Sequence, residues 1–191
     1  MRVSWLVCAI PLLLAAELPP ENKVKIVKLF EVPNYCEGVV FDHDGNGYIS
    51  HGKVITKFTP DGKHGTWVQM GAPNGHKILA DGTHLVCDGE FNAVLRLDAD
   101  GKLMGQASSM CDGKPLRAPN DLTLDQANGG FYFTDPGGSD DKKLIGTMHY
   151  VDKNGRTHLV DKGLAFPNGI VLTPDDSPTA PIRTVCQRTR S

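Results

Sequence analysis

The stretch that decides the fold is PNDLTLDQANGGFYFTD, residues 119–135. Two β-rich runs, Leu122–Leu124 and Phe131–Thr134, lie on either side of a turn at Asn128–Gly130. Runs of this kind joined by a short glycine-containing turn are typical of an antiparallel hairpin. We therefore expect the first two strands of a β-sheet unit here, and Thr147–Val151 and His158–Val160 to complete that unit.

The same order of strand, turn, strand, strand, turn and strand occurs earlier in the chain and begins again at Ile170–Leu172. The earlier units contain the expected strands Val39–Phe41, Tyr48–Ser50, Val54–Phe58, Thr66–Gln69, Lys77–Leu79, His84–Cys87 and Val94–Leu97. The units recur at roughly 40 to 50 residues, which is the period of propeller blades. The sequence therefore predicts an all-β fold over residues 22–176, a β-propeller of about three and a half blades.

A short motif opens each unit, which a plain β-sandwich would not explain. The four openings are Tyr35–Gly38, Pro73–Gly75, Pro119–Asp121 and Pro167–Gly169. The innermost strand of every propeller blade starts near the central axis, so these openings should meet at one end of the channel.

The openings carry oxygen-bearing side chains, Glu37, Asn120 and Asn168. One carboxylate with amide oxygens suits calcium better than zinc or copper, although other divalent cations are possible. The alternative is that these residues only form turns, as most Asn-Gly pairs do. Their recurrence at equivalent places favours a metal site at the channel mouth.

A second acidic stretch, Asp42–Gly47, matches the first half of an EF-hand loop. Its twelfth position is Lys53 instead of a bidentate Glu, and strands are expected on both sides, so we interpret it as a hairpin turn. The sequence contains no His-Glu-x-x-His motif and no Gly-x-Ser-x-Gly elbow. The sequence therefore does not favour a zinc hydrolase or a hydrolase with a serine nucleophile.

The amino-acid composition makes some classes of binding partner improbable. Lys plus Arg number 20 and Asp plus Glu 22 among 191 residues, a net charge of −2 that provides no sustained positive field for nucleic acid. The five cysteines form no Cys-x-x-Cys pair, and their spacing predicts no particular disulfide.

The two ends differ from the repeat. Arg2 and an apolar run from Val3 to Ala16 predict a signal peptide over residues 1–20, hence an exported protein, periplasmic or secreted, that is not held in a membrane after cleavage. A buried N-terminal helix or an uncleaved anchor is the alternative. At the other end, residues 177–191 show no strand alternation, which indicates an atypical tail from a premature end or shifted frame after Asp176. A native tail on a self-associating half-propeller is the alternative.

Four motifs together resemble those of the gluconolactonase, regucalcin and luciferin-regenerating-enzyme family, over Val24 to Asp175. They are Glu37-Gly38, Ala118–Leu122, Tyr132–Pro136 and Phe166–Ile170. The resemblance implies a six-bladed propeller, here only its N-terminal part, with calcium-assisted ester chemistry. It implies three metal ligands, Glu37, Asn120 and Asn168. It also implies an acidic catalytic neighbour, Asp121, and two substrate-pocket residues, Asn74 and Asp135.

The resemblance implies a small-molecule substrate, a sugar lactone or related cyclic ester. The same resemblance also allows organophosphates or other esters as substrates. Asp121 would act either as general base or by orienting Asn120 and a metal-bound water. The family's fourth metal ligand, an Asp of a later blade, has no counterpart here, so this chain is expected to be inactive or impaired. The competing hypotheses are a noncatalytic binding propeller and a fragment that does not fold.

Overall fold

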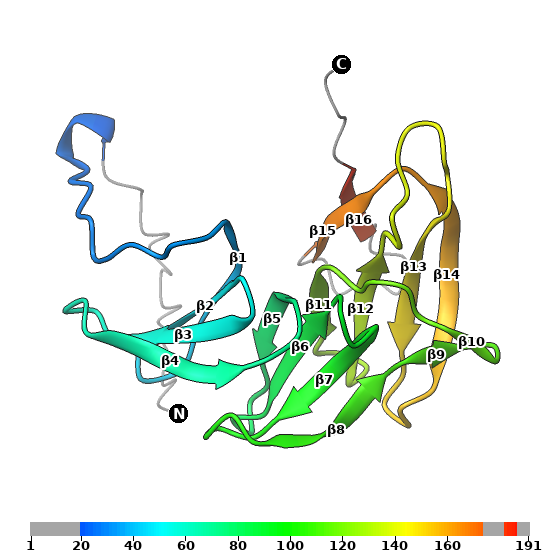
Figure 1. Ribbon diagram of the computed structural model, residues 1–191, viewed down its shortest axis with the longest axis horizontal. Coiled ribbons are helices and arrows are strands. Elements are labelled where there is room, and N and C mark those ends of the chain that lie inside the picture. Colours follow the sequence, from blue (N-terminus) through cyan, green and yellow to red (C-terminus); the bar gives the residue numbers. More distant parts are fainter. Residues whose placement is uncertain (1–19, 174–181, 187–191) are drawn as a thin grey trace, which may run out of the picture.

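The computed structural model describes residues 20–173 and 182–186. Apart from one short 3-10 helix, η1 (Glu21–Lys23), the described elements are strands. Three four-stranded antiparallel sheets and a two-stranded sheet at the C-terminal end follow one another around an arc, and a second two-stranded sheet lies beside them (Figure 1). The all-β prediction of three and a half propeller blades is confirmed.

Each complete blade is a meander of four consecutive strands. The first blade comprises β1 (Cys36–Phe41), β2 (Gly47–His51), β3 (Val54–Phe58) and β4 (His64–Gln69). The second comprises β5 (Pro73–Ile78), β6 (His84–Asp88), β7 (Ala93–Leu97) and β8 (Leu103–Ser108). The third comprises β11 (Leu122–Asp125), β12 (Gly130–Asp135), β13 (Gly146–Val151) and β14 (Thr157–Leu164). The half blade comprises β15 (Pro167–Leu172) and β16 (Ile182–Cys186).

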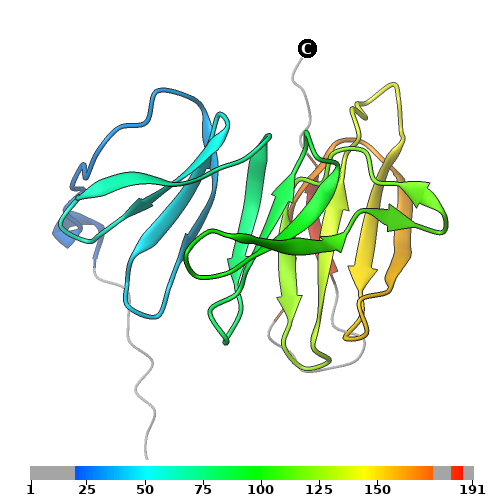
Figure 2. The ribbon, with the colours of Figure 1, turned by 60° about the horizontal axis from the view of Figure 1, so that its bottom comes forward.

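The structure adds elements that the repeat did not predict. A small hairpin of β9 (Met110–Cys111) and β10 (Lys114–Pro115) lies between the second and third blades, beside β14. The outer strand of the second blade, β8, was also absent from the expected strands, because Leu103–Ser108 lacks a run of β-branched or aromatic residues. Figure 2 shows the hairpin standing out from the sheets.

The first strand of three blades carries the same irregularity. Between Glu37 and Val40, three steps along β1 oppose two along β2, from Ser50 to Tyr48. β5 and β15 show the same offset against β6 and β16. Such an offset is a β-bulge, which bends the strand and changes the direction of a side chain. The Pro73 and Pro167 openings thus lie inside bulged strands instead of immediately before them.

The Asp42–Gly47 stretch forms the turn between β1 and β2, as the sequence interpretation predicted. Asp42 Oδ1 accepts hydrogen bonds from the backbone N–H groups of Asp44 and Asn46, at 3.1 and 2.8 Å. The carboxylate of Asp42, the first position of the apparent EF-hand loop, therefore accepts hydrogen bonds from the backbone of its own turn.

Apolar side chains fill the spaces between blades. Tyr48 and Ile55 of the first blade pack with Val86 and Leu95 of the second. A second cluster joins the second and third blades and contains Leu85, Cys87, Val94, Leu116, Leu122, Phe131, Phe133 and Val151. Because each cluster takes residues from two sheets, neighbouring blades stabilise one another.

The structure describes little of the two ends of the chain. The expected signal peptide, residues 1–20, lies outside the described residues except for Pro20. Of the expected atypical tail, only Ile182–Cys186 is described, and it pairs antiparallel with β15 as the strand β16. Among the described residues, no helix has the length and apolar character needed to cross a membrane.

Candidate functional site

One cavity of about 300 Å³ lies where the blade openings meet. Four of the predicted site residues line it: Glu37, Asn74, Asp121 and Asn168. They come from the first strands, or the residue just before the first strand, of four successive blades. Residues that are more than 130 positions apart in the sequence thus border a single space.

Close backbone contacts between first strands hold this arrangement. Gly38 has a φ of +61°, and a Cβ placed on it would lie 1.8 Å from the carbonyl oxygen of Asn74. The N–H of Gly75 donates to the carbonyl of Asn120 at 2.7 Å. Only glycine permits such an approach of two backbones, which explains why glycine follows Glu37 and Asn74.

Asp121 joins the third blade to the fourth. Its Oδ2 accepts a hydrogen bond from the N–H of Ile170 at 3.1 Å, next to the Asn168 opening. In parallel, the Thr134 hydroxyl donates to the carbonyl oxygen of Asn168 at 2.7 Å. One Asp121 oxygen is therefore engaged in positioning β15, while the side chain still borders the cavity.

Glu37 is oriented by a neighbour. The hydroxyl of Tyr35 donates to Glu37 Oε1 at 2.7 Å, and this hydrogen bond raises the pKa of Tyr35 above its ordinary value. Tyr35 is largely exposed, so the contact directs the carboxylate without closing the cavity.

Asn120, the remaining predicted metal ligand, is not among the residues that line the cavity. The residue is 8% exposed, and its Oδ1 has no hydrogen-bond partner among the described residues. A buried polar oxygen left unpaired is costly, so this atom fits a group that would be supplied from outside the chain. No group of three His, Cys, Asp or Glu side chains suited to a metal occurs in the described ranges, so a cation here would depend on amide oxygens beside Glu37.

Asp135, the second predicted pocket residue, lies elsewhere. It is 2% exposed, and its two carboxylate oxygens accept from the backbone N–H groups of Arg117 and Ala118 at 3.0 and 2.8 Å. Asp88 ends β6 as Asp135 ends β12, and it accepts from four backbone N–H groups, those of Gly71, Ala72, Glu90 and Phe91. The common position in two blades shows that this aspartate holds the segment that leads into the opening of its own blade.

Known proteins share the sequence pattern and the fold of this chain. The SMP-30/gluconolactonase/LRE-like region matches residues 22–179. This chain belongs to that family. The gluconolactonase of Zymomonas mobilis is 29% identical over 168 residues, which cover 75% of this chain and 47% of that protein. This family member thus spans about half the length of that relative.

Solved structures show the same fold. A gluconolactonase from Xanthomonas campestris matches this family member with a TM-score of 0.69 at 21% identity, covering 84% of this chain and 61% of the other. A calcium-binding regucalcin from Agrobacterium tumefaciens matches with a TM-score of 0.63 at 18% identity, covering 77% and 50%.

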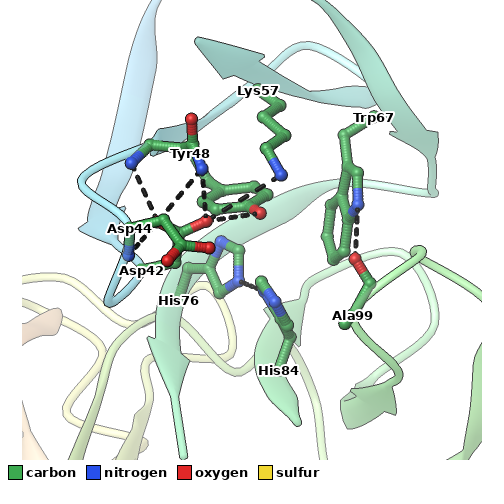
Figure 3. A network of polar contacts seen from close by, with 9 residues as sticks. Asp42, Asp44, Tyr48, Lys57, Trp67, His76, His84 and Ala99 are labelled. Atoms are coloured by element: carbon green, nitrogen blue, oxygen red, sulfur yellow. Dashed lines mark hydrogen bonds and ion pairs between the residues drawn. The ribbon is translucent and has the colours of Figure 1, made fainter. Parts of the chain in front are cut away.

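Two residues that line the cavity of this family member, His76 and Lys77, were not predicted. Both follow Asn74-Gly75 directly in β5, so they could have been found as the residues next to that opening. His76 is 1% exposed, and its Nε2 lies 2.8 Å from Nδ1 of His84. Figure 3 shows this pair beside Tyr48 and Trp67.

Burial lowers the pKa of both histidines, to about 3 for His76 and about 4 for His84, so the folded pair is neutral at pH 7. Unfolded histidines bind protons below about pH 6.5, whereas the folded pair does not until pH 4 or below, so the unfolded state binds more protons between these values. Stability is therefore complete above about pH 6.5 and is lost as the pH falls toward 4.

We expect the free energy of unfolding to drop by about 2 kcal/mol or more between about pH 7.5 and pH 5, measured by urea titration. His84→Gln should flatten this dependence, whereas His43→Gln, at an exposed turn position, should leave it unchanged. An equally steep dependence in His84→Gln would mean that other groups cause it.

Proposed function

We propose that this protein takes part in calcium-dependent hydrolysis of sugar lactones or related cyclic esters. The carrying observation is that Glu37, Asn74, Asp121 and Asn168, from four successive blades, line one cavity. Family membership and the names of the gluconolactonase relatives support the reaction class, and the calcium-binding regucalcin supports the cation.

Glu37, Asn120 and Asn168 would hold the cation. The carboxylate of Glu37 supplies charge, and the amide oxygens of the two asparagines are the hard donors that calcium prefers. Calcium, when bound, supplies a Lewis acid for the lactone carbonyl. The unpaired Oδ1 of Asn120 is the structural feature that favours this set.

The other lining residues would handle substrate and proton. Asn74 and Lys77 can donate hydrogen bonds to the oxygens of a sugar lactone. Asp121 keeps Oδ1 for orienting the attacking water or accepting its proton, since Oδ2 accepts from Ile170. Asp135 has no part in this proposal, because its carboxylate is occupied by backbone N–H groups. Export by the residue 1–20 segment is part of the proposal and would place the reaction outside the cytoplasm.

The test is removal of the cation. A panel of aldonolactones is assayed with the 191-residue chain and with a form completed by the remaining C-terminal segment of the Zymomonas mobilis gluconolactonase. Chelator should abolish hydrolysis in the completed form, and added calcium should restore it. Hydrolysis that persists unchanged in chelator would rule out the calcium mechanism.

The second candidate function is a noncatalytic binding propeller, favoured by the fact that the chain spans about half the length of the gluconolactonase relative. It predicts calcium or ligand binding without turnover in either form. Calorimetric titration of calcium into both forms, beside the hydrolysis assay, separates the two functions.

A further inference from the structure

Lys77 differs from the residues at the same position of the other repeating units. The openings and first strands of the four units align without gaps as CEGVVF, PNGHKI, PNDLTL and PNGIVL, residues 36–41, 73–78, 119–124 and 167–172. Val40, Thr123 and Val171 occupy the position of Lys77, and the pairing registers of β1 and β5 agree with this alignment. β-Branched residues suit a half-buried strand, whereas lysine is depleted there. A departure from the local pattern of this kind is expected mainly at functional sites.

The side chain of Lys77 points away from the first blade. His76, the residue before it, packs near the rings of Tyr48 and Trp67 in the first blade, with ring centroids 5.8 and 6.0 Å away (Figure 3). Successive residues of a strand point to opposite faces of the sheet, so Lys77 points toward the side of the third blade. It is half-buried, and it lines the candidate cavity together with Asp121 of the third opening. Lys77 therefore belongs to the wall of the cavity.

The ammonium group of Lys77 has no anionic partner among the described residues. Glu37 and Asp121 line the same cavity, yet neither lies within ion-pair distance of it. One oxygen of each carboxylate already accepts a hydrogen bond from another residue. An ammonium group has three donors and no acceptor, and its strongest hydrogen bonds are those to anions. Its charge is therefore available to a ligand in the cavity.

We infer that Lys77 binds a carboxylate of the substrate, so that the substrates are lactones of aldaric acids, which carry a carboxylate at the end far from the lactone carbonyl. This inference rests on the proposed lactone hydrolysis and names its substrate class. Lys77 lies three residues further along β5 than Asn74. Its ammonium group would therefore meet the far end of a substrate whose carbonyl lies beside the opening residues, and a carboxylate there would form a charge-assisted hydrogen bond.

The test compares two lactones that differ in one group. D-Glucaro-1,5-lactone has a carboxylate where D-glucono-1,5-lactone has a hydroxymethyl group. With calcium, the completed form should hydrolyse the glucarolactone with a kcat/KM about tenfold higher, through a lower KM. Lys77→Gln should abolish this preference, and Lys77→Arg should retain it. Lys102→Gln, at an exposed lysine outside the cavity, should leave it unchanged.

A binding measurement requires no turnover. The 1,5-lactams of D-glucarate and D-gluconate keep the ring and its carbonyl, and their amide bond resists hydrolysis. All residues that line the cavity lie in the 191-residue chain, so this chain is titrated by calorimetry in the presence of calcium. The glucarolactam should bind about tenfold more tightly, and this difference should shrink as salt is added. Lys77→Gln should bind both lactams equally, while the salt dependence of the unaltered chain does not depend on any variant folding.

The outcomes separate this inference from the proposed function. Hydrolysis of both lactones with equal kcat/KM would overturn the inference and leave the hydrolase in place. Equal binding of the two lactams, or no binding by a chain with native circular dichroism, would also overturn it. So would an equal loss of rate on both lactones in Lys77→Gln, because the ammonium group would then stabilise the reaction without recognising a carboxylate. Hydrolysis of neither lactone, with Lys77-dependent binding of the glucarolactam, would overturn the hydrolase and retain the carboxylate site.

Discussion

Glu37→Ala is expected to lower calcium-dependent lactone hydrolysis by the ring-completed form by about a thousandfold. Glu37 is the only one of the three proposed cation ligands that carries a charge, and it borders the cavity at the first opening. Without it, the two amide oxygens would have to hold a divalent ion alone, which flexible neutral donors do poorly.

Two matched variants make this result interpretable. Glu31→Ala removes an exposed glutamate outside the cavity and should leave the rate unchanged. Tyr35→Phe removes only the hydroxyl that donates to Glu37 Oε1, so it should weaken calcium binding modestly, by about tenfold or less. Calcium affinity by calorimetry and initial rates on an aldonolactone provide both readouts. Wild-type rates in Glu37→Ala would refute the site.

Gly38→Ala is expected to destabilise the chain by about 4 kcal/mol, a large part of the stability of an ordinary domain. The residue has a positive φ, and its new methyl group would lie 1.8 Å from the Asn74 carbonyl oxygen. Because that atom is backbone, relief requires β1 and β5 to separate. The junction of the first two blades would then open and take Glu37 away from Asn74.

Gly65→Ala is the matched control, since Gly65 lies in β4 with no atom near the position of a new Cβ. It should change the free energy of unfolding by no more than about 0.5 kcal/mol in urea titrations. If Gly38→Ala matched Gly65→Ala in stability, the close approach of β1 and β5 would be wrong.

Much of the fold could be predicted from the sequence because hairpin turns and β-rich runs are local signals. Asp42–Gly47 formed a turn as its glycines and flanking strands indicated. The β9–β10 hairpin was not predicted, because Met110–Pro115 contains no run of β-branched residues and does not belong to the repeating unit.

The candidate site was predictable only where a motif repeats. Recurrence at the openings identified Glu37, Asn120 and Asn168, of which Glu37 and Asn168 line one cavity, and Asn74 and Asp121, which the family resemblance implied, line it too. Whether Asp135 borders that cavity depends on three-dimensional neighbours that no spacing reveals. An aspartate at the end of a second strand can face substrate or the backbone that precedes the first strand of its own blade, and here the N–H groups of Arg117 and Ala118 donate to it.

The extra residue near the start of β1, β5 and β15 also has an evolutionary consequence. A shift of one position turns every later side chain of a strand to the opposite face of the sheet. The direction of an opening residue therefore depends on the one extra residue that its strand has relative to the paired strand. A gene segment that encodes one such blade therefore also encodes the bulge that sets the direction of its opening residue. Copying such a segment would deliver a new inward-pointing donor in a single event, and changing one codon could then diversify the chemistry around the axis.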